Sequence, residues 1–207
     1  MIALIDYGAG NVRSVHKALT AVRADVVVTQ DPAVVRSADK VVLPGVGAFA
    51  DCMAGLQRLG MGEAIAEVAA RNVPFLGICV GMQVLFEEGE EMGHHPGLGL
   101  LPGQVVHLAV APLLKVPHTG WNQVLQTKVS PLLRDLPDGA WAYFNHGYIC
   151  RARPEHTLAV ADYGGPFACV VGHGSVFGVQ FHPEKSQGVG LHLLRAFVEG
   201  APDARAF

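Results

Sequence analysis

The fold is decided by residues 73–83, which read VPFLGICVGMQ. An apolar run ends at a cysteine, Cys79, that stands between two glycines, Gly77 and Gly81. A short apolar run is typical of a buried strand, and small residues around a nucleophile are typical of a sharp strand-to-helix turn. The stretch therefore predicts a strand, a tight turn and a helix, with a thiol at the corner.

Upstream of this stretch, strand-like and helix-like patterns alternate. Strands with little polar alternation indicate burial on both faces, and apolar residues at helical spacing indicate covering helices. Such alternation is typical of βαβ units and a parallel sheet. We expect strands at Ile2–Ile5, Val26–Thr29, 40–43 and 73–78, and helices at 11–22, 48–59, Met61–Ala70 and 80–88.

Beyond Gly89 the pattern changes. Residues 90–103 are rich in Gly, Pro and His and indicate a loop. Short β-like runs follow at 104–108, 140–144, 157–161, 167–171 and 175–180, and a last helix is expected at 190–199. These runs predict antiparallel strands and hairpins added to the parallel sheet. Since no repeat or linker interrupts the chain, we expect a single α/β domain over residues 1–207.

Composition narrows the classes of function. The chain has 207 residues, of which 50% are hydrophobic and 16% charged, so a well-buried core is expected and disorder is not. The net charge of -3 and the lack of a basic run favour neither nucleic acid nor an anionic membrane as partner. The first residues already indicate a strand, with no secretory signal and no membrane-spanning stretch. We expect a soluble, cytoplasmic protein.

The other cysteines and histidines do not suggest a cofactor or metal. Cys52, Cys150 and Cys169 are scattered, and packed free thiols are the simplest interpretation. His94 and His95 lie in a polar segment without further ligands at zinc spacing.

A second motif, residues 181–185, supplies the chemistry that a cysteine nucleophile needs. It reads FHPEK and follows a strand-like run, so His182 and Glu184 fall on the same side of an extended segment. A free thiol has a pKa of about 8.5, and a histidine oriented by a carboxylate helps to remove its proton. A helix starting at Val80 would also favour the thiolate. Together the two motifs predict acyl transfer through a thioester.

A glycine-rich turn at residues 44–47 follows the third expected strand. Its backbone N–H groups suit an oxyanion, although a phosphate cradle or a plain turn is also compatible with the pattern. Its position favours the oxyanion, because this turn and the Cys79 turn share the carboxyl edge of a parallel sheet. The segment 7–11 reaches the same edge, but its G-x-G is too weak to indicate a nucleotide.

These motifs, taken in order, resemble class I glutamine amidotransferases. More narrowly, the chain is similar to the glutaminase subunits of imidazole glycerol phosphate synthase. The resemblance runs nearly end to end and implies a three-layer fold with a mainly parallel, open central sheet flanked by helices. The segments that carry it are 6–11, 44–49, 77–83, 115–118, 120–122 and 178–187.

The resemblance implies a role for each matching residue. Cys79 would form a γ-glutamyl thioester, His182 would act as base and then acid, and Glu184 would orient His182. The oxyanion hole and the glutamine contacts would come from Gly45, Val46, Gly47, Val80, Gln83, His146, Gly147 and Tyr148. Residues facing a partner subunit near an ammonia passage would be Asn11, Trp121, Tyr143 and Lys185.

The resemblance also implies a partner. A (β/α)8-barrel does not fit in this chain beside a glutaminase, so a separate cyclase barrel is expected as the other half of a heterodimer. It would use ammonia to convert a phosphoribulosyl-formimino carboxamide ribonucleotide to imidazole glycerol phosphate and an aminoimidazole carboxamide ribotide, in histidine biosynthesis. We expect low glutaminase activity until the partner and its nucleotide bind, with gating by residues 44–47.

One departure and two alternatives remain. The family usually has serine between the histidine and the tyrosine of segment 146–148, where this chain has Gly147. The chain could instead serve another acceptor, such as those of pyridoxal phosphate, purine, pyrimidine or anthranilate synthesis. It could also be a non-catalytic interaction module on the same fold, although the complete set Cys79, His182 and Glu184 argues against this.

Overall fold

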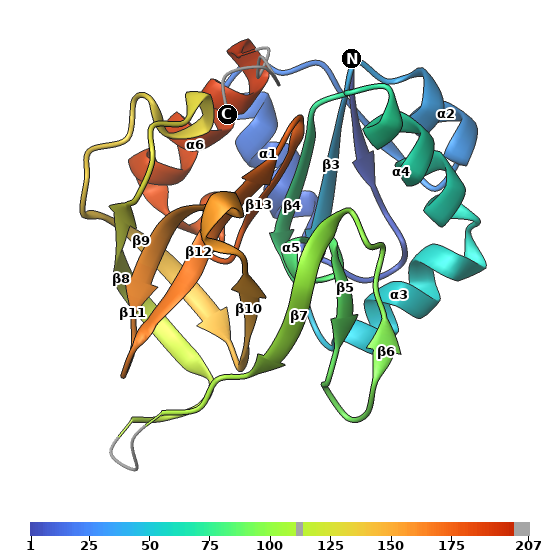
Figure 1. Cartoon of the computed structure of the whole chain (residues 1–207). Coiled ribbons are helices and arrows are strands. Elements are labelled where there is room, and N and C mark those ends of the chain that lie inside the picture. The colour runs from blue at the N-terminus through green and yellow to red at the C-terminus, as the bar shows by residue number, and fades with distance from the viewer. Residues whose placement is uncertain (111–113, 201–207) are drawn as a thin grey trace.

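A nine-stranded sheet forms the centre of the molecule in the computed structural model, which describes residues 1–110 and 114–200 (Figure 1). The strand order is β2-β1-β3-β4-β13-β12-β11-β8-β9. The first five strands are parallel, and the other four continue the sheet antiparallel. The strands are β1 (Ile2–Ile5), β2 (Val26–Thr29), β3 (Lys40–Gly45), β4 (Phe75–Cys79), β13 (Val176–Val179), β12 (Pro166–His173), β11 (Thr157–Asp162), β8 (His118–Gln126) and β9 (Ala140–His146).

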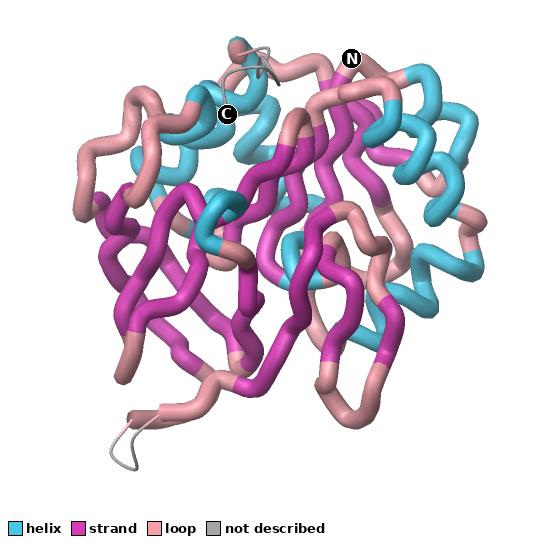
Figure 2. The backbone as a smooth tube through the Cα atoms, in the orientation of Figure 1, coloured by secondary structure: helices cyan, strands magenta, loops and turns pink. Residues whose placement is uncertain are grey.

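Helices cover the parallel half of the sheet on both faces, as Figure 2 shows. The chain steps from β1 outward to β2 and then back past β1 to β3 and β4. Right-handed crossovers in opposite directions place their helices on opposite faces. Thus α1 (Val12–Ala21) packs with α6 (Gln187–Glu199), and α4 (Met61–Ala70) packs with α2 (Pro32–Ser37) and α3 (Phe49–Arg58). Single 3-10 turns occur at Pro131–Leu133, Pro154–His156 and Pro183–Lys185.

The point at which the winding reverses lies between β1 and β3. Ligands of open α/β sheets bind at the carboxyl ends of the strands near such a point. The expected parallel arrangement is confirmed, and every residue of its inner strands β1, β3 and β4 is buried except Lys40, as two-sided burial requires. On the edge strand β2, Val27 and Val28 are instead partly exposed.

A second, four-stranded sheet was not expected. Its order is β10-β7-β5-β6, formed by β5 (Phe86–Gly89), β6 (His95–Pro96), β7 (Leu101–His107) and β10 (Tyr148–Ala152). The predicted helix at 80–88 begins at Val80 as expected but is wrong beyond Gln83, because α5 (Val80–Gln83) makes a single turn before β5 begins. The predicted loop at 90–103 is also wrong in part, since it contains β6 and the start of β7.

The physical reason for this difference is the uniform burial of the segment after Cys79. Val84, Leu85 and Phe86 are fully buried, so their pattern has no polar face from which a period could be read. Pairing of β5 with β7 then decides the conformation. Gly89 packs against the Phe49 ring, where an added Cβ atom would lie 2.8 Å from Cδ2.

The expected packed thiols are confirmed, because Cys52, Cys150 and Cys169 are all buried. Over the two described ranges, no helix has the length and apolar character needed to cross a membrane.

Candidate active site

The nucleophile turn is a tight packing of backbone against backbone. Cys79 ends β4 with φ 55° and ψ −112°, a conformation that costs about 1–3 kcal/mol for a residue with a side chain. A Cβ atom at Gly81 would collide with the Leu43 carbonyl oxygen, and one at Gly77 would collide with the Gly81 carbonyl. The predicted need for both glycines is confirmed. Their close backbone packing holds the turn at Cys79 against β3.

His182 and Glu184 lie beside this corner because β13 is the strand next to β4. The register pairs Val179 with Ile78, so the segments that follow the two strands leave the sheet side by side. His182 Nδ1 lies 2.9 Å from Glu184 Oε1, with side-chain exposures of 3% and 0%. Asn11 Nδ2 donates to the same carboxylate oxygen at 3.1 Å. This leaves Nε2 of His182 for the thiol.

The electrostatics of this pair favour a strong base. Burial alone lowers the pKa of His182, but hydrogen bonds to Cys79 and Glu184 outweigh it and raise the pKa to about 9. Burial alone raises the pKa of Glu184, but the hydrogen bond and charge of His182 hold it below its usual range. An imidazole with this pKa competes well for a thiol proton, since a free thiol has a pKa of about 8.5. The arrangement is suited to activate Cys79.

The loop of residues 180–186, called the catalytic loop because it carries His182 and Glu184, is attached to β9, the outermost strand of the sheet. His182 N–H donates to the Tyr143 carbonyl at 2.9 Å, and Tyr143 N–H donates to Ser186 Oγ at 2.9 Å. Ser186 Oγ in turn donates to the His182 carbonyl at 2.7 Å. The backbone of His182 is thereby fixed to β9.

A small pocket of about 130 Å³ opens over the thiol. Larger hollows of about 670 and 850 Å³ lie beside α1 and α3, and their walls include neither Cys79 nor His182. The chemistry therefore belongs to the small pocket. Its walls contain Val46, Gly47, Cys79, Val80, Gln83, Glu91, Asn145, His146, Gly147, Tyr148, His182 and Lys185.

Most of the predicted catalytic and substrate-binding residues thus meet in one place, with two differences, and Lys185, which was expected to face the partner, also lines the pocket. Gly45 lies behind the wall, packed against the Gly81 backbone and paired with Cys79 across β3 and β4. Glu184 is likewise behind His182 rather than in the wall. Glu91 was missed by the sequence argument, since it stands in the polar segment after β5 and no local motif marks it.

Two buried amide side chains, those of Gln83 and Gln180, lie next to the thiol and the pocket wall. Gln83 Nε2 donates to the Tyr148 carbonyl and to Gln180 Oε1, each at 3.2 Å. Gln180 Nε2 lies 3.8 Å from Cys79 Sγ, and the thiol points at the Asn145 carbonyl 4.0 Å away. Gln83 therefore links the pocket wall at Tyr148 to Gln180, which lies next to the thiol.

An exposed aromatic patch lies on β8 and β9, next to the catalytic loop. Trp121 pairs with Tyr143 across the two strands, and their ring centroids are 6.1 Å apart. Lys185 Nζ lies 5.6 Å from the Tyr143 ring. Trp141, which the sequence argument did not single out, is 54% exposed on the same strand as Tyr143. Asn11 stands apart from this patch, with its side chain turned to Glu184.

Comparison with known proteins agrees with this geometry. Residues 3–201 match the family model for glutamine amidotransferase class-I, and the chain belongs to that family. A solved structure described as a crystal structure of glutamine amidotransferase has a TM-score of 0.75 at 18% identity, covering 96% of this chain and 98% of that one. The structure of PurLQS from Thermotoga maritima has a TM-score of 0.73 at 19% identity, with 96% of each chain covered. Both likenesses show the fold.

Closer relatives define the branch of the family. Imidazole glycerol phosphate synthase subunit HisH of Rhodospirillum rubrum is 51% identical, over 97% of this chain and 99% of that protein. The HisH subunit of Caulobacter vibrioides is 49% identical with the same coverage, and that of Desulfitobacterium hafniense strain Y51 is 50% identical over 95% and 93%. Within the class-I family, the chain therefore groups with the HisH subunits.

Proposed function

We propose that this chain is the glutaminase subunit of an imidazole glycerol phosphate synthase, hydrolysing L-glutamine to glutamate and ammonia. The observation that carries the proposal is the meeting of Cys79, His182 and Glu184 at one pocket, in a chain half identical to HisH subunits over nearly all its length.

The first half of the reaction forms a thioester. His182 Nε2 takes the thiol proton, and Cys79 Sγ attacks the side-chain carbonyl carbon of glutamine. The oxyanion that forms is stabilised by the backbone N–H of Val80 and by that of Val46 or Gly47 after a local rearrangement. When the carbon–nitrogen bond breaks, His182 returns the proton to the leaving nitrogen, and ammonia departs.

The second half releases glutamate. His182, again unprotonated, takes a proton from water as the water oxygen attacks the thioester carbonyl. The carbon–sulfur bond breaks and Cys79 recovers the proton through His182. Glu184 keeps the imidazole in the required orientation throughout, through its 2.9 Å bond to Nδ1.

The remaining pocket walls suit the amino-acid end of glutamine. Glu91 lines the pocket, and one of its carboxylate oxygens accepts the Phe49 N–H at 2.8 Å. A carboxylate held in this way is a suitable partner for the α-ammonium group of the substrate. Lys185, which also lines the pocket, is a suitable partner for the α-carboxylate. Gln83 and segment 146–148 complete the contacts.

The acceptor chemistry belongs to a partner. We assign to it the aromatic patch, which combines exposed Trp121 and Trp141 with Tyr143 and Lys185, as exposed aromatic residues are enriched at interfaces. The proposed partner is the cyclase barrel, and ammonia would pass through the interface, since free ammonia protonates in water. We further propose that the heterodimer works in the cytoplasm.

The test is glutamate release, measured for the chain alone, with a cyclase subunit, and with that subunit plus its nucleotide. We expect strong activity only in the full mixture and none with Cys79→Ala. Comparable rates with and without the partner would contradict the gating by residues 44–47. Activation by a synthase for another acceptor, and not by the cyclase, would overturn the assignment.

A further inference from the structure

Two buried histidines on neighbouring strands are bonded to each other beside the pocket. His118 of β8 and His146 of β9 are cross-strand partners, and His118 Nδ1 lies 3.0 Å from His146 Nε2. The residues are 3% and 5% exposed. Only one of the two facing nitrogens can carry the shared proton, so the pair must adopt a defined tautomeric state.

A hydrogen bond from Asn122 to His118 determines which tautomer His118 adopts. Its Nδ2 donates to the Asp162 carbonyl at 2.7 Å, and its Oδ1 accepts the Gln123 N–H at 2.8 Å. Since both ends of this amide are fixed, Asn122 presents an N–H to His118 Nε2, at 3.4 Å. Nε2 of His118 must then be an acceptor, and the proton of this ring is on Nδ1.

The positions of the other ring protons follow from the one on His118 Nδ1. His118 Nδ1–H donates to His146 Nε2, so the proton of His146 is on Nδ1, from which it donates to the Tyr148 carbonyl at 2.9 Å. Both rings are neutral in this arrangement. Burial favours the same state, because it lowers the pKa of His118 and lowers that of His146 to about 4.

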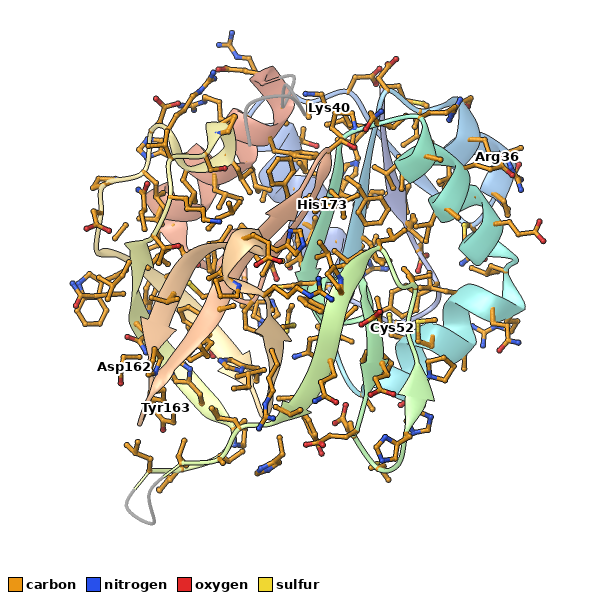
Figure 3. All side chains as sticks on the ribbon, viewed as in Figure 1. Arg36, Lys40, Cys52, Asp162, Tyr163 and His173 are labelled. Atoms are coloured by element: carbon orange, nitrogen blue, oxygen red, sulfur yellow. The ribbon has the colours of Figure 1, made fainter. Side chains whose placement is uncertain are left out.

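Aromatic packing fixes the first ring. His118 stacks on Tyr163 with ring centroids 4.0 Å apart and on Phe144 at 5.1 Å. Figure 3 shows Tyr163 beside Asp162 at the end of β11, next to β8. We call Asn122, His118 and His146 the histidine relay. Its first two members lie on β8, the strand that also carries the exposed Trp121.

The relay ends in the substrate pocket. The Tyr148 carbonyl that accepts from His146 also accepts from Gln83, and both His146 and Tyr148 line the pocket over Cys79. We propose that His118 is a positioning residue for glutamine binding, which acts through His146 to hold segment 146–148 in its binding geometry. This inference rests on the proposed glutaminase function.

The first test separates the hydrogen bond from the ring that makes it. His118→Phe keeps a stacking ring but has no donor, whereas His118→Asn places an N–H near the former Nδ1 position. In the complex with the cyclase subunit, we expect His118→Phe to raise the KM for glutamine about tenfold, since a buried acceptor loses its donor. Its kcat should stay within about threefold of the parent value, because the triad is untouched.

His118→Asn should return KM to within about threefold of the parent value, because it restores the donor. His156→Asn serves as the matched control, because His156 lies in the turn Pro154–His156 and not in the pocket wall. Its KM and kcat should not change. An unchanged KM in His118→Phe, or an equal rise in the Phe and Asn variants, would overturn the proposal.

The second test needs no activity. Nitrogen-15 NMR of the imidazoles in the chain alone should show His118 and His146 neutral at pH 7, both protonated on Nδ1. A charged ring, or a proton on Nε2 of either ring, would refute the relay. If the parent complex does not hydrolyse glutamine, the proposed function fails, and this spectrum still shows whether the relay itself exists.

Discussion

At the scale of single residues, the two glycines beside Cys79 have no room for a side chain. The collision of a Cβ atom at Gly81 is with the backbone of β3, which cannot move without opening the sheet. We expect Gly81→Ala to lower the free energy of unfolding by about 3 kcal/mol or more, measured by urea denaturation.

Gly62 provides the matched control for this substitution. It lies in the first turn of α4, and no atom comes within 4 Å of an added Cβ. Gly62→Ala should leave stability unchanged or raise it by up to about 1 kcal/mol, because alanine favours the helix. Equal effects of the two substitutions would mean that the strand-to-turn packing is looser than described.

Gly147, in contrast to Gly81, has room for a side chain. A Cβ atom there would be 3.5 Å from Val116 Cγ1, an ordinary contact. We therefore expect Gly147→Ser to fold normally, with an unfolding free energy within about 0.5 kcal/mol of the parent. Steady-state kinetics with the partner should give a KM for glutamine equal to or below the parent value, since the segment already lines the pocket. A KM below the parent value would show that the missing hydroxyl matters to this site, whereas a higher KM would contradict the prediction by showing that the added side chain obstructs glutamine.

The triad could be predicted from sequence because each member stands in a short motif whose local geometry is set by its neighbours. Gly77 and Gly81 mark the turn at Cys79, and Pro183 separates two residues that must share a side. Glu91 and Trp141 could not be predicted in this way. Their places depend on contacts with Phe49 and with β8, which are distant in sequence.

At the scale of elements, buried parallel strands were predictable and the second sheet was not. Continuous apolar runs identify β1, β3 and β4, because both faces of these strands are covered. In β8, polar residues alternate at exposed positions and give little apolar signal. The strand exists because β9 and β11 pair with its two edges.

One lysine ties the last helix to the sheet. Lys40, labelled in Figure 3, donates from Nζ to the carbonyls of Phe197, Val198 and Gly200 at 2.7, 2.8 and 2.5 Å. A cation is well placed at a helix C-terminus, where carbonyls lack partners. Lys40→Met should lower the unfolding free energy by about 2 kcal/mol, as expected for charge-assisted hydrogen bonds.

Lys17→Met is the comparison for this prediction, because Lys17 is an exposed residue of α1. Its unfolding free energy should stay within about 0.5 kcal/mol of the parent. Hydrogen exchange should also show faster opening of α6 in Lys40→Met alone. If α6 exchanges at the parent rate, the three bonds do not hold the helix.

At the scale of the whole molecule, two histidines should give stability a maximum in pH. Burial lowers the pKa of His146 to about 4, so below about pH 6.5 the unfolded chain binds a proton that the native ring does not. Stability should fall by up to about 3 kcal/mol between pH 6.5 and 4. For His182, burial is outweighed by its bonds to Cys79 and Glu184, and the raised pKa of about 9 means that stability falls as pH rises from about 6.5 to 9.

Urea denaturation at pH 4.5, 6.5 and 8.5 measures both limbs. His146→Gln should flatten the acid limb, and His182→Gln should flatten the alkaline limb. A parent curve without a maximum near pH 6.5, or variants with unchanged slopes, would mean that other groups govern the pH dependence.

The attachment of the catalytic loop to β9 also protects the folded protein from aggregation at a strand edge. β9 is the last strand of the main sheet, and an open strand edge invites pairing with another chain. At Tyr143 this edge is already occupied by His182 and Ser186. Since the loop follows every described strand in sequence, the edge stays bare while the sheet is being synthesised. The segment that carries His182 thus also covers this edge in the completed fold and limits aggregation there, but it cannot protect the chain before the last strand has been made.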